Sequence, residues 1–367
     1  MNFTVTKSNL LQAVQTVYRS SQAKASLPAL GSILFRAEGE SLTVTSTDID
    51  LTVQCRTPVN VITNGEICLP ARQIVDIVRC LPDTAVQMES DPETSSVKIL
   101  YDNSEINIKG YPAENFPSLP EITDCTTLQL TQGTLKEMIR QTIYAVSQDK
   151  TRPLFTGVLF EKNGRNLRLV ATDTHRLALR EAEAEAEEFS SVIVPGSSLN
   201  ELTRVMKQEE EKVSIKIGRT HISFATAESL LVSRLITGQF PMYSQIIPTT
   251  FSSSLVMSTE ELSSALARAS LLIDDDPPIL RFNLAREDSF VFLSTDSGWI
   301  REKLRANYEG EAMEIFFNAR YLIETLRVIP TEEVTVSFTS PLSAAIIKPA
   351  GREDCLALLL PARPKNE

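Results

Sequence analysis

The chain carries one pattern three times, and this internal repeat limits its fold more than any other feature does. The copies are marked by three tripeptides, each of which closes an alternating apolar run: Ser46-Thr47-Asp48, Ala171-Thr172-Asp173 and Ser294-Thr295-Asp296. Alternation of apolar and polar residues is typical of a half-buried strand, so each tripeptide is predicted to end a strand. The 367 residues are therefore expected to form several similar domains rather than one large core.

Each copy also predicts two helices at matching positions. The three threonines are followed, 23 residues later in every copy, by the residues Pro70, Pro195 and Asn318. Apolar stripes with helical spacing come next: Ile74, Ile77, Val78 and Leu81, then Leu199, Leu202, Val205 and Met206, then Leu322, Ile323, Leu326 and Ile329. A second helical pattern surrounds Leu10, Leu135 and Leu262, which lie 37, 37 and 33 residues before the threonines.

Further alternating runs follow the second helix of each copy, at 86–88 with 97–99, at 213–217 and at 334–338. Each copy thus reads as strand, helix, several strands, helix and several strands, which is an α+β domain whose helices cover a sheet. The predicted domains are 1–120, 128–248 and 255–363, because turn residues gather at 116–127 and 240–254. The segment 181–188 alternates Glu with Ala, and a solvated helical or turn segment is favoured over an interaction tail.

Composition narrows the class of protein. Hydrophobic residues make up 42% and charged residues 23%, without a run of about 20 apolar residues, which predicts a soluble protein. The N-terminus lacks a basic segment followed by an apolar one, so a cytoplasmic location is expected. Five cysteines without a Cys-x-x-Cys pair, with only His175 and His221 beside them, favour reduced thiols over a zinc site. Nothing in the sequence requires a nucleotide cofactor.

Four motifs resemble one known family. They are Leu27-Pro28-Ala29-Leu30, the string from Ala171 to Leu177, Phe240-Pro241-x-Tyr243 and the terminal Leu360-Pro361-x-Arg363. Together with the threefold repeat, they resemble the bacterial sliding clamps, the beta subunits of DNA polymerase III, over essentially the whole chain. The resemblance implies a DNA-replication processivity factor without intrinsic catalysis, in which three clamp domains from each of two copies close a head-to-tail ring. Helices would line the hole around double-stranded DNA, and sheets would lie outside.

The resemblance also implies partners. The ring would tether the replicative polymerase, a clamp loader and other clamp-binding proteins, with ATP use belonging to the loader. Leu271 and Leu272 are expected at the homodimer interface, while an ordinary place in the core of their own domain is equally compatible with the sequence. A head-to-tail interface has to close, because an open one would produce filaments.

Charge offers an independent check of DNA binding. The six predicted helices carry eleven basic and six acidic side chains, a net charge of +5, within a chain of formal charge -11. A basic lumen in an acidic ring would attract phosphates without coating the exterior in nucleic acid. The DNA-facing candidates are Lys24, Arg72, Arg79, Lys136, Arg140, Arg204 and Lys207. Contacts to phosphate do not read sequence, so binding should be sequence-independent and topology should hold the DNA.

The family further implies an apolar groove for partner peptides between the second and third domains. Here it would comprise Phe155, Thr172, Thr174, His175, Arg176, Leu177, Pro241, Ile246, Leu358, Leu359, Leu360 and Pro361, with Arg152, Tyr321, Leu342, Ala344 and Arg363 at its margins. Aliphatic walls would anchor the peptide, while His175 and Arg176 orient it by hydrogen bonds. The run from Leu358 to Leu360 is also compatible with a buried last strand.

Four positions depart from the family pattern. Thr174 stands where glycine is frequent, Gln245 where a basic residue is frequent, and Leu360 and Ala362 where methionines are frequent. Because methionine adapts its shape to different partners, its loss predicts a less forgiving pocket.

Two other functions compete with a clamp. Asp173 and His175 could form an acid/base pair, but Asp48 and Asp296 recur in copies without a following histidine, which suggests a structural turn role. A repeat-built interaction scaffold that never touches DNA would share the repeat and the groove, although the basic helices argue against it. Retention on circular DNA would separate the scaffold from the clamp.

Overall fold

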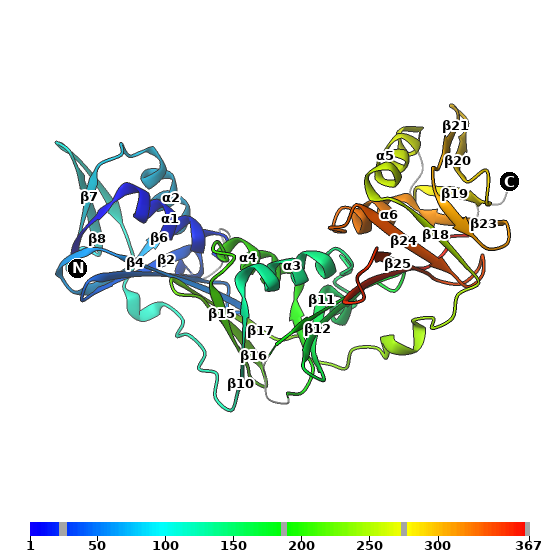
Figure 1. Cartoon of the computed structure of the whole chain (residues 1–367). Helices are drawn as coiled ribbons and strands as arrows, with labels where there is room; N and C mark the ends of the chain where they lie inside the picture. Colours follow the sequence, from blue (N-terminus) through cyan, green and yellow to red (C-terminus); the bar gives the residue numbers. More distant parts are fainter. Residues whose placement is uncertain (22–27, 185–188, 273–276, 364–367) are drawn as a thin grey trace. The chain divides into compact units, whose positions relative to one another are not determined.

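The computed structural model describes residues 1–21, 28–184, 189–272 and 277–363 (Figure 1). Its contacts divide the chain into two compact units. The first holds Met1–Thr134 and Ser197–Leu235, and the second holds Leu135–Ala184, Ser190–Gly196 and the chain from Ile236 onward. The boundary between units therefore falls inside the second sequence repeat.

The first unit contains a five-stranded sheet of order β5-β1-β7-β8-β9 and an eight-stranded sheet of order β10-β15-β16-β17-β4-β3-β2-β6. All neighbouring strands within them are antiparallel. The strands are β1 Asn2–Thr6, β2 Ser32–Glu38, β3 Ser41–Thr47, β4 Leu51–Pro58, β5 Asn60–Thr63, β6 Gly65–Pro70, β7 Ala85–Asp91, β8 Ser96–Tyr101, β9 Ser104–Lys109, β10 Thr126–Thr131, β15 Lys212–Ile217, β16 His221–Ala225 and β17 Ser229–Arg234.

The second unit has the same design. A nine-stranded sheet of order β14-β11-β12-β13-β26-β25-β24-β18-β22 accompanies a four-stranded sheet of order β21-β20-β19-β23. The strands are β11 Gly157–Asn163, β12 Asn166–Thr172, β13 Arg176–Glu183, β14 Val192–Pro195, β18 Ser253–Ser258, β19 Ile279–Leu284, β20 Phe290–Thr295, β21 Gly298–Lys303, β22 Asn307–Glu309, β23 Met313–Asn318, β24 Glu333–Phe338, β25 Ala345–Pro349 and β26 Cys355–Leu359.

The large sheets run from one repeat into the next. β4 of the first repeat pairs with β17 of the second, and β13 of the second repeat pairs with β26 of the third. An unpaired strand edge would leave a row of backbone donors and acceptors without partners. Pairing across the repeats satisfies these backbone groups, so neighbouring repeats share a continuous sheet rather than folding as independent domains.

The described residues include six α-helices, two for each repeat: α1 Lys7–Tyr18, α2 Ala71–Cys80, α3 Gln132–Ile143, α4 Gly196–Val205, α5 Thr259–Ala269 and α6 Ala319–Leu326. Side chains cap four of them. Thr6 accepts a hydrogen bond from the Asn9 amide, Thr131 from the Thr134 amide, Ser258 from the Glu261 amide and Asn318 from the Arg320 amide. Short 3₁₀ turns lie at η1 Pro28–Gly31, η2 Ala113–Asn115, η3 Pro153–Thr156, η4 Tyr243–Ile246 and η5 Ser270–Leu272.

The predicted elements are confirmed. β3, β12 and β20 end at Thr47, Thr172 and Thr295, and the residues 23 positions later directly precede α2, α4 and α6. The helical stripes form the cores: Leu10, Ile74, Leu135, Leu199, Leu262 and Leu322 are all buried. In Figure 1, α1 and α2 lie together beside one sheet of the first unit, and α5 and α6 do so in the second.

One local prediction is wrong. The Glu-Ala alternation was expected to form a helical or turn segment, yet β13 continues through Glu183. Alternation has the period of a strand, and Glu181 accepts a hydrogen bond from Arg168 on the neighbouring β12. The rest of that prediction, from residue 185 to 188, lies outside the described residues.

The cysteines agree with reduced thiols. All five are free: Cys55, Cys68 and Cys355 are buried, Cys125 is half-buried and Cys80 is exposed. Burial raises the pKa of the Cys68 and Cys355 thiols to about 11. In the described part of the chain, no helix combines the length and apolar character needed to cross a membrane.

Candidate peptide-binding and nucleic-acid interfaces

The Thr-Asp-x-His-Arg string forms a turn that its own side chains hold together. The Thr172 hydroxyl donates to the Arg176 carbonyl at 2.6 Å and accepts from the Thr174 amide. One Asp173 carboxylate oxygen accepts from the backbone amides of His175 and Arg176, at 2.9 and 3.0 Å. The carboxylate therefore binds the backbone of His175, which agrees with a turn role for Asp173 rather than an acid/base pair.

The first repeat contains a similar turn. There Thr47 accepts from the Ile49 amide at 3.0 Å, and Asp48 accepts from the Leu51 amide at 2.7 Å. Ile49 and Thr174 both have left-handed backbone angles, with φ of 83° and 80°. β-Branched residues rarely adopt this region, so both turns hold a strained residue. The third turn is two residues shorter, because Thr295 pairs directly with Gly298.

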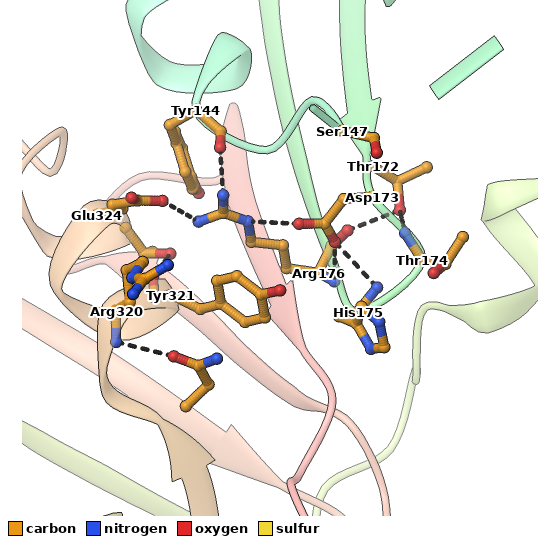
Figure 2. Close-up of polar contacts among 12 residues, drawn as sticks. Tyr144, Ser147, Thr172, Asp173, Thr174, His175, Arg176, Arg320, Tyr321 and Glu324 are labelled. Carbon is orange, nitrogen blue, oxygen red and sulfur yellow. Dashed lines mark hydrogen bonds and ion pairs between the residues drawn. The ribbon is translucent and has the colours of Figure 1, made fainter. Parts of the chain in front are cut away.

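Arg176 is the centre of the candidate site in the second unit (Figure 2). Its side chain is only 8% exposed, and its guanidinium donates to the Asp173 carboxylate at 3.0 Å. It also donates to Glu324 on α6 and to the backbone carbonyl of Tyr144. A buried guanidinium needs such partners, because an unpaired charge would be costly away from water.

Aromatic rings complete the surroundings of Arg176. The guanidinium carbon lies 4.4 Å from the ring centre of Tyr321 and 5.3 Å from that of Tyr144. His175 stacks beside Tyr321, with ring centres 6.3 Å apart and planes inclined by 22°. Burial raises the pKa of Tyr144 to about 12. The turn after β12 is thereby fastened to α6 of the next repeat.

This network revises the expected role of Arg176. Its donors are engaged with Asp173, Glu324 and Tyr144, so in this structure it holds two repeats together. His175 is the exposed member of the pair. Tyr144 and Glu324 were not among the residues expected at this site; only the spacing of Tyr321 and Glu324, three residues apart on one helix face, pointed to Glu324.

The apolar wall of the predicted groove is formed by β13 and β26. Leu177 pairs with Leu358, Arg176 pairs with Leu359, and the Leu360 amide donates to the His175 carbonyl at 2.9 Å. Leu177, Leu358 and Leu359 are nearly inaccessible, which confirms the buried-strand interpretation for this run. Leu360, just beyond the strand, is 42% exposed and is the member that a ligand could reach.

The remaining predicted groove residues divide by exposure. Ile246 is 55% exposed and Leu342 is 91% exposed, whereas Ala344 is buried in one apolar cluster with Leu177 and Leu358. Phe155, Tyr321 and Pro361 are half-buried, and Arg152, Thr174, Pro241 and Arg363 are exposed. Their grouping into one peptide groove stays a prediction.

The Phe-Pro-x-Tyr motif is fixed to β11 and β12 of the second unit. The Tyr243 hydroxyl donates to Glu161 on β11 and accepts from Arg168 on β12 at 2.8 Å. Burial, together with the hydrogen bond to Glu161, raises the pKa of Tyr243 to about 12. Phe240 and Tyr243 pack into the same cluster as Leu177. Pro241 and Met242 line a surface groove beside this anchor.

The predicted DNA-facing cations lie on or next to helices. Arg72 and Arg79 flank Asp76 on α2, at 3.9 and 3.5 Å, and both are largely exposed. Arg204 pairs with Glu201 on α4, and the Lys207 amine lies 3.5 Å from the Thr16 hydroxyl. Lys136 and Arg140 belong to α3. Lys24 lies outside the described residues.

Comparisons with known proteins place this architecture. Three domain models of one family match in order: the DNA polymerase III beta subunit N-terminal domain over residues 1–120, its central domain over 129–242 and its C-terminal domain over 244–363. The beta sliding clamp of Bacillus subtilis is 32% identical over 377 residues, covering 99% of this chain and all of that protein. That of Pseudomonas putida is 32% identical over 371 residues, with the same coverage.

Solved structures agree. The DNA polymerase sliding clamp of Bacillus subtilis superposes with a TM-score of 0.95 at 31% identity, covering 100% of both chains. A sliding clamp from Pseudomonas aeruginosa, solved with bound griselimycin, gives 0.95 at 29% identity, covering 99% of this chain and 100% of that one.

Three tandem α+β domains of this kind define the class of DNA sliding clamps. The chain belongs to the DNA polymerase III beta subunit family. It is therefore a sliding clamp, a processivity factor of DNA replication, and it is not an enzyme. In the described residues, no group of histidine, cysteine or acidic side chains could hold a metal ion.

Proposed function

We propose that two copies of this chain close head to tail into a ring around duplex DNA and tether the replicative polymerase to it. The observation that carries the proposal is the rule by which the repeats join. At each junction, a strand at the end of one repeat's part of the sheet pairs with the last strand of the following repeat. β4 pairs with β17 at the first junction, and β13 pairs with β26 at the second. β21 and β9 occupy the equivalent places and lie at the ends of their sheets.

The strand registers predict how β21 and β9 would pair. Pro70, Pro195 and Asn318 hold the same position in their repeats. Following the paired residues from each of them across the next three strands, and then one residue along the chain, leads to Val53, Ala178 and Ile300, which are therefore equivalent. Thr6, Thr131 and Ser258 are likewise equivalent. The strand pairings that begin at these residues make Ile106, Leu231 and Ala357, in the same order, equivalent to one another. Val53 pairs with Leu231, and Ala178 with Ala357.

The third junction would therefore place Ile300 of one copy opposite Ile106 of the other. The next antiparallel pair is Arg301 opposite Glu105, which brings opposite charges together. Leu271 supports the same contact: it follows α5, is 79% exposed and thus lies outside the core of its own domain. On the other copy, a groove lined by Ile77, Ile108 and Tyr111 offers it an apolar seat. These pairings would close a ring because they repeat at both ends.

DNA would pass through the ring and be held by topology. The exposed cations of α2, α3 and α4 support phosphate contacts that do not read sequence. The groove around His175, Ile246 and Leu360 would take the peptides of the polymerase, the clamp loader and other partners. Its exposed apolar residues next to buried walls are what a short hydrophobic peptide needs. A cytoplasmic location stays a prediction.

The ring is tested by sedimentation and by retention on nicked circular DNA before and after linearisation. A dimer that stays on circles and leaves linear ends is expected. Leu271→Asp should yield monomers that fall off circles, while Leu342→Asp, the same change at a more exposed leucine, should leave the dimer intact. A monomeric wild type, or retention indifferent to ends, would favour an interaction scaffold instead.

The register is tested by charge exchange. Arg301→Glu and Glu105→Arg should each weaken dimerisation severalfold, and the double variant should recover it. Recovery would support the antiparallel pairing of β21 with β9. If the double variant dimerised still more weakly than either single variant, this register would be rejected. The ring itself would still be tested by retention on circular DNA.

A further inference from the structure

The four-stranded sheet of the second unit has an unusual outer face. Its inner face, with Leu280, Phe282, Val291, Ile315 and Phe317, is buried against the α5 and α6 core. Strand alternation turns the remaining residues of β19, β20, β21 and β23 to the opposite side. There the registers align Phe316, Arg281, Phe292 and Arg301 in one row across all four strands.

Aromatic rings and arginines alternate along this row. The Arg281 guanidinium carbon lies 4.4 Å from the centre of the Phe292 ring, and that of Arg301 lies 3.9 Å from the centre of the Phe290 ring. Trp299 stacks on Phe292, with ring centres 6.4 Å apart and planes 21° from parallel. Such contacts hold the guanidiniums flat against the sheet and form an open stacking platform.

Trp299 is the most exposed member of the platform. It is the single tryptophan of the chain and is 68% exposed. A large apolar ring kept at the surface costs solubility, and such residues mark binding sites when they cluster. The edge pairing proposed above would use the backbone of β21, place Arg301 beside Glu105 of the other copy at the rim, and leave the rest of this face uncovered.

Polar atoms on the same face also await a partner. Among the described residues, the Arg281 Nε and the Asn283 Oδ1 are buried without a hydrogen-bond partner. Both belong to β19 and lie two residues apart, on the platform side. Buried polar atoms are normally satisfied, so these two atoms mark β19 as a strand whose hydrogen bonding is incomplete on the platform side.

Charge narrows the class of ligand. Arg281, Arg301 and Lys303 lie on this face, opposed by Glu314 at 3.7 Å from Arg281 and by Asp288 at 2.6 Å from Arg301. Both ion pairs are solvent-exposed and therefore weak, so a phosphate could displace either carboxylate. The local excess of positive charge contrasts with the formal charge of -11 for the whole chain.

We propose that this outer face binds single-stranded nucleic acid. Bases would stack on Trp299 and on the guanidiniums that cover the phenylalanines, and phosphates would meet Arg281, Arg301 and Lys303. An open four-stranded sheet that presents aromatic and guanidinium planes is a known way to splay and stack unpaired bases. Stacking accepts any base, so binding should show little sequence preference. Duplex DNA hides its base faces and should not use the platform.

Tryptophan fluorescence tests the proposal directly, because only Trp299 reports. The full-length protein is titrated with a single-stranded oligothymidylate of about 12 nucleotides at low salt. Saturable quenching that reverses as salt is raised is expected. Arg281→Ala combined with Lys303→Ala, which leaves the proposed Arg301–Glu105 contact intact, should weaken binding about tenfold. Arg36→Ala, which removes an exposed, ion-paired strand arginine elsewhere, should leave it unchanged.

A second readout separates stacking from charge. With a fluorescently labelled oligothymidylate, Trp299→Ala should lower affinity about tenfold, and Trp299→Phe should keep most of it. Equal quenching by duplex DNA, or equal weakening by Arg36→Ala, would overturn the proposal as nonspecific phosphate binding. Quenching that follows protein concentration without DNA would assign the face to a second copy. Quenching by an acidic peptide but not by the oligonucleotide would assign it to a protein partner.

Discussion

Arg176 and Glu324 form an ion pair although 148 positions separate them in the sequence. The arginine begins β13 of the second repeat, and the glutamate lies on α6 of the third. Asp173 and the Tyr144 carbonyl share the same guanidinium (Figure 2). One buried cation thus holds the turn beside the candidate peptide groove and fastens it to the following repeat.

Removal of this cation should destabilise the second unit strongly. Arg176→Ala removes the cation that Asp173 and Glu324 share, and we expect a loss of about 3 kcal/mol in the free energy of unfolding, measured in urea. Glu324→Gln should cost less, about 1 kcal/mol, because Glu324 is 33% exposed and water can replace part of the contact. Arg204→Ala, which breaks an exposed pair on α4, should change stability by less than about 0.5 kcal/mol. Equal effects of the two arginine variants would contradict the role given to Arg176.

Thr174→Gly should stabilise the protein. Thr174 holds a φ of 80°, where a β-branched side chain is strained and glycine is not. The gain is expected to be about 1 kcal/mol, reduced by the greater entropy of glycine in the unfolded chain. Thr174→Ala is the matched control, since alanine keeps the Cβ atom responsible for the strain. A Thr174→Gly variant that melts below the wild type would show that the Thr174 side chain has a compensating contact.

The peptide range should widen when methionine is restored. Leu360 is the exposed end of the β26 wall, and leucine adapts its shape less than methionine does. Against a panel of hydrophobic peptides, Leu360→Met should reduce the spread of dissociation constants severalfold relative to the wild type. Ala362→Met should act in the same direction. An unchanged spread for both variants would mean that the pocket is no less forgiving than those of its relatives.

The burial of Tyr144 should make the stability of the protein fall at alkaline pH. Its pKa is raised from 10.0 to about 12, first because burial disfavours the phenolate. The unfolded chain loses this proton near pH 10, and the folded chain loses it near pH 12. The stability that the protonated phenol contributes is therefore fully present below pH 10 and is lost as the pH rises from 10 to 12. Tyr144→Phe should remove about 1 kcal/mol of the loss between pH 9 and pH 11. Urea unfolding at pH 9 and pH 11, compared for both proteins, measures the difference. Parallel losses in the two proteins would assign the alkaline sensitivity to other groups.

Thiol labelling should follow burial. Cys80 is exposed and should react first, whereas Cys68 and Cys355 should react only after unfolding, because the thiolate is the reactive form and burial raises their pKa to about 11. Mass spectrometry after timed alkylation near pH 8, with and without urea, measures the order. Rapid alkylation of Cys355 in the native protein would indicate that β26 opens.

Much of the fold could be read from local pattern. The threefold repeat, the strand ends at Thr47, Thr172 and Thr295, and the starts of the helices all follow from spacing and periodicity, which depend on neighbours along the chain. The turn role of Asp173 was also accessible, because Asp48 recurs at the same place without a histidine after it. The prediction for the Glu-Ala stretch was wrong because it relied on the high charge of the segment, whereas the alternation with a period of two indicated a strand.

Pairings between distant elements could not be read in that way. The sequence alone determined the repeat, the elements within each copy and the family to which they point. Only the tertiary structure decided that β4 joins β17, that β13 joins β26, and that Arg176 is buried against Glu324 rather than free to bind a peptide. The physical reason is that periodicity fixes which face of an element is apolar, whereas the partner of a sheet edge or a buried charge depends on groups that meet only after the chain has folded.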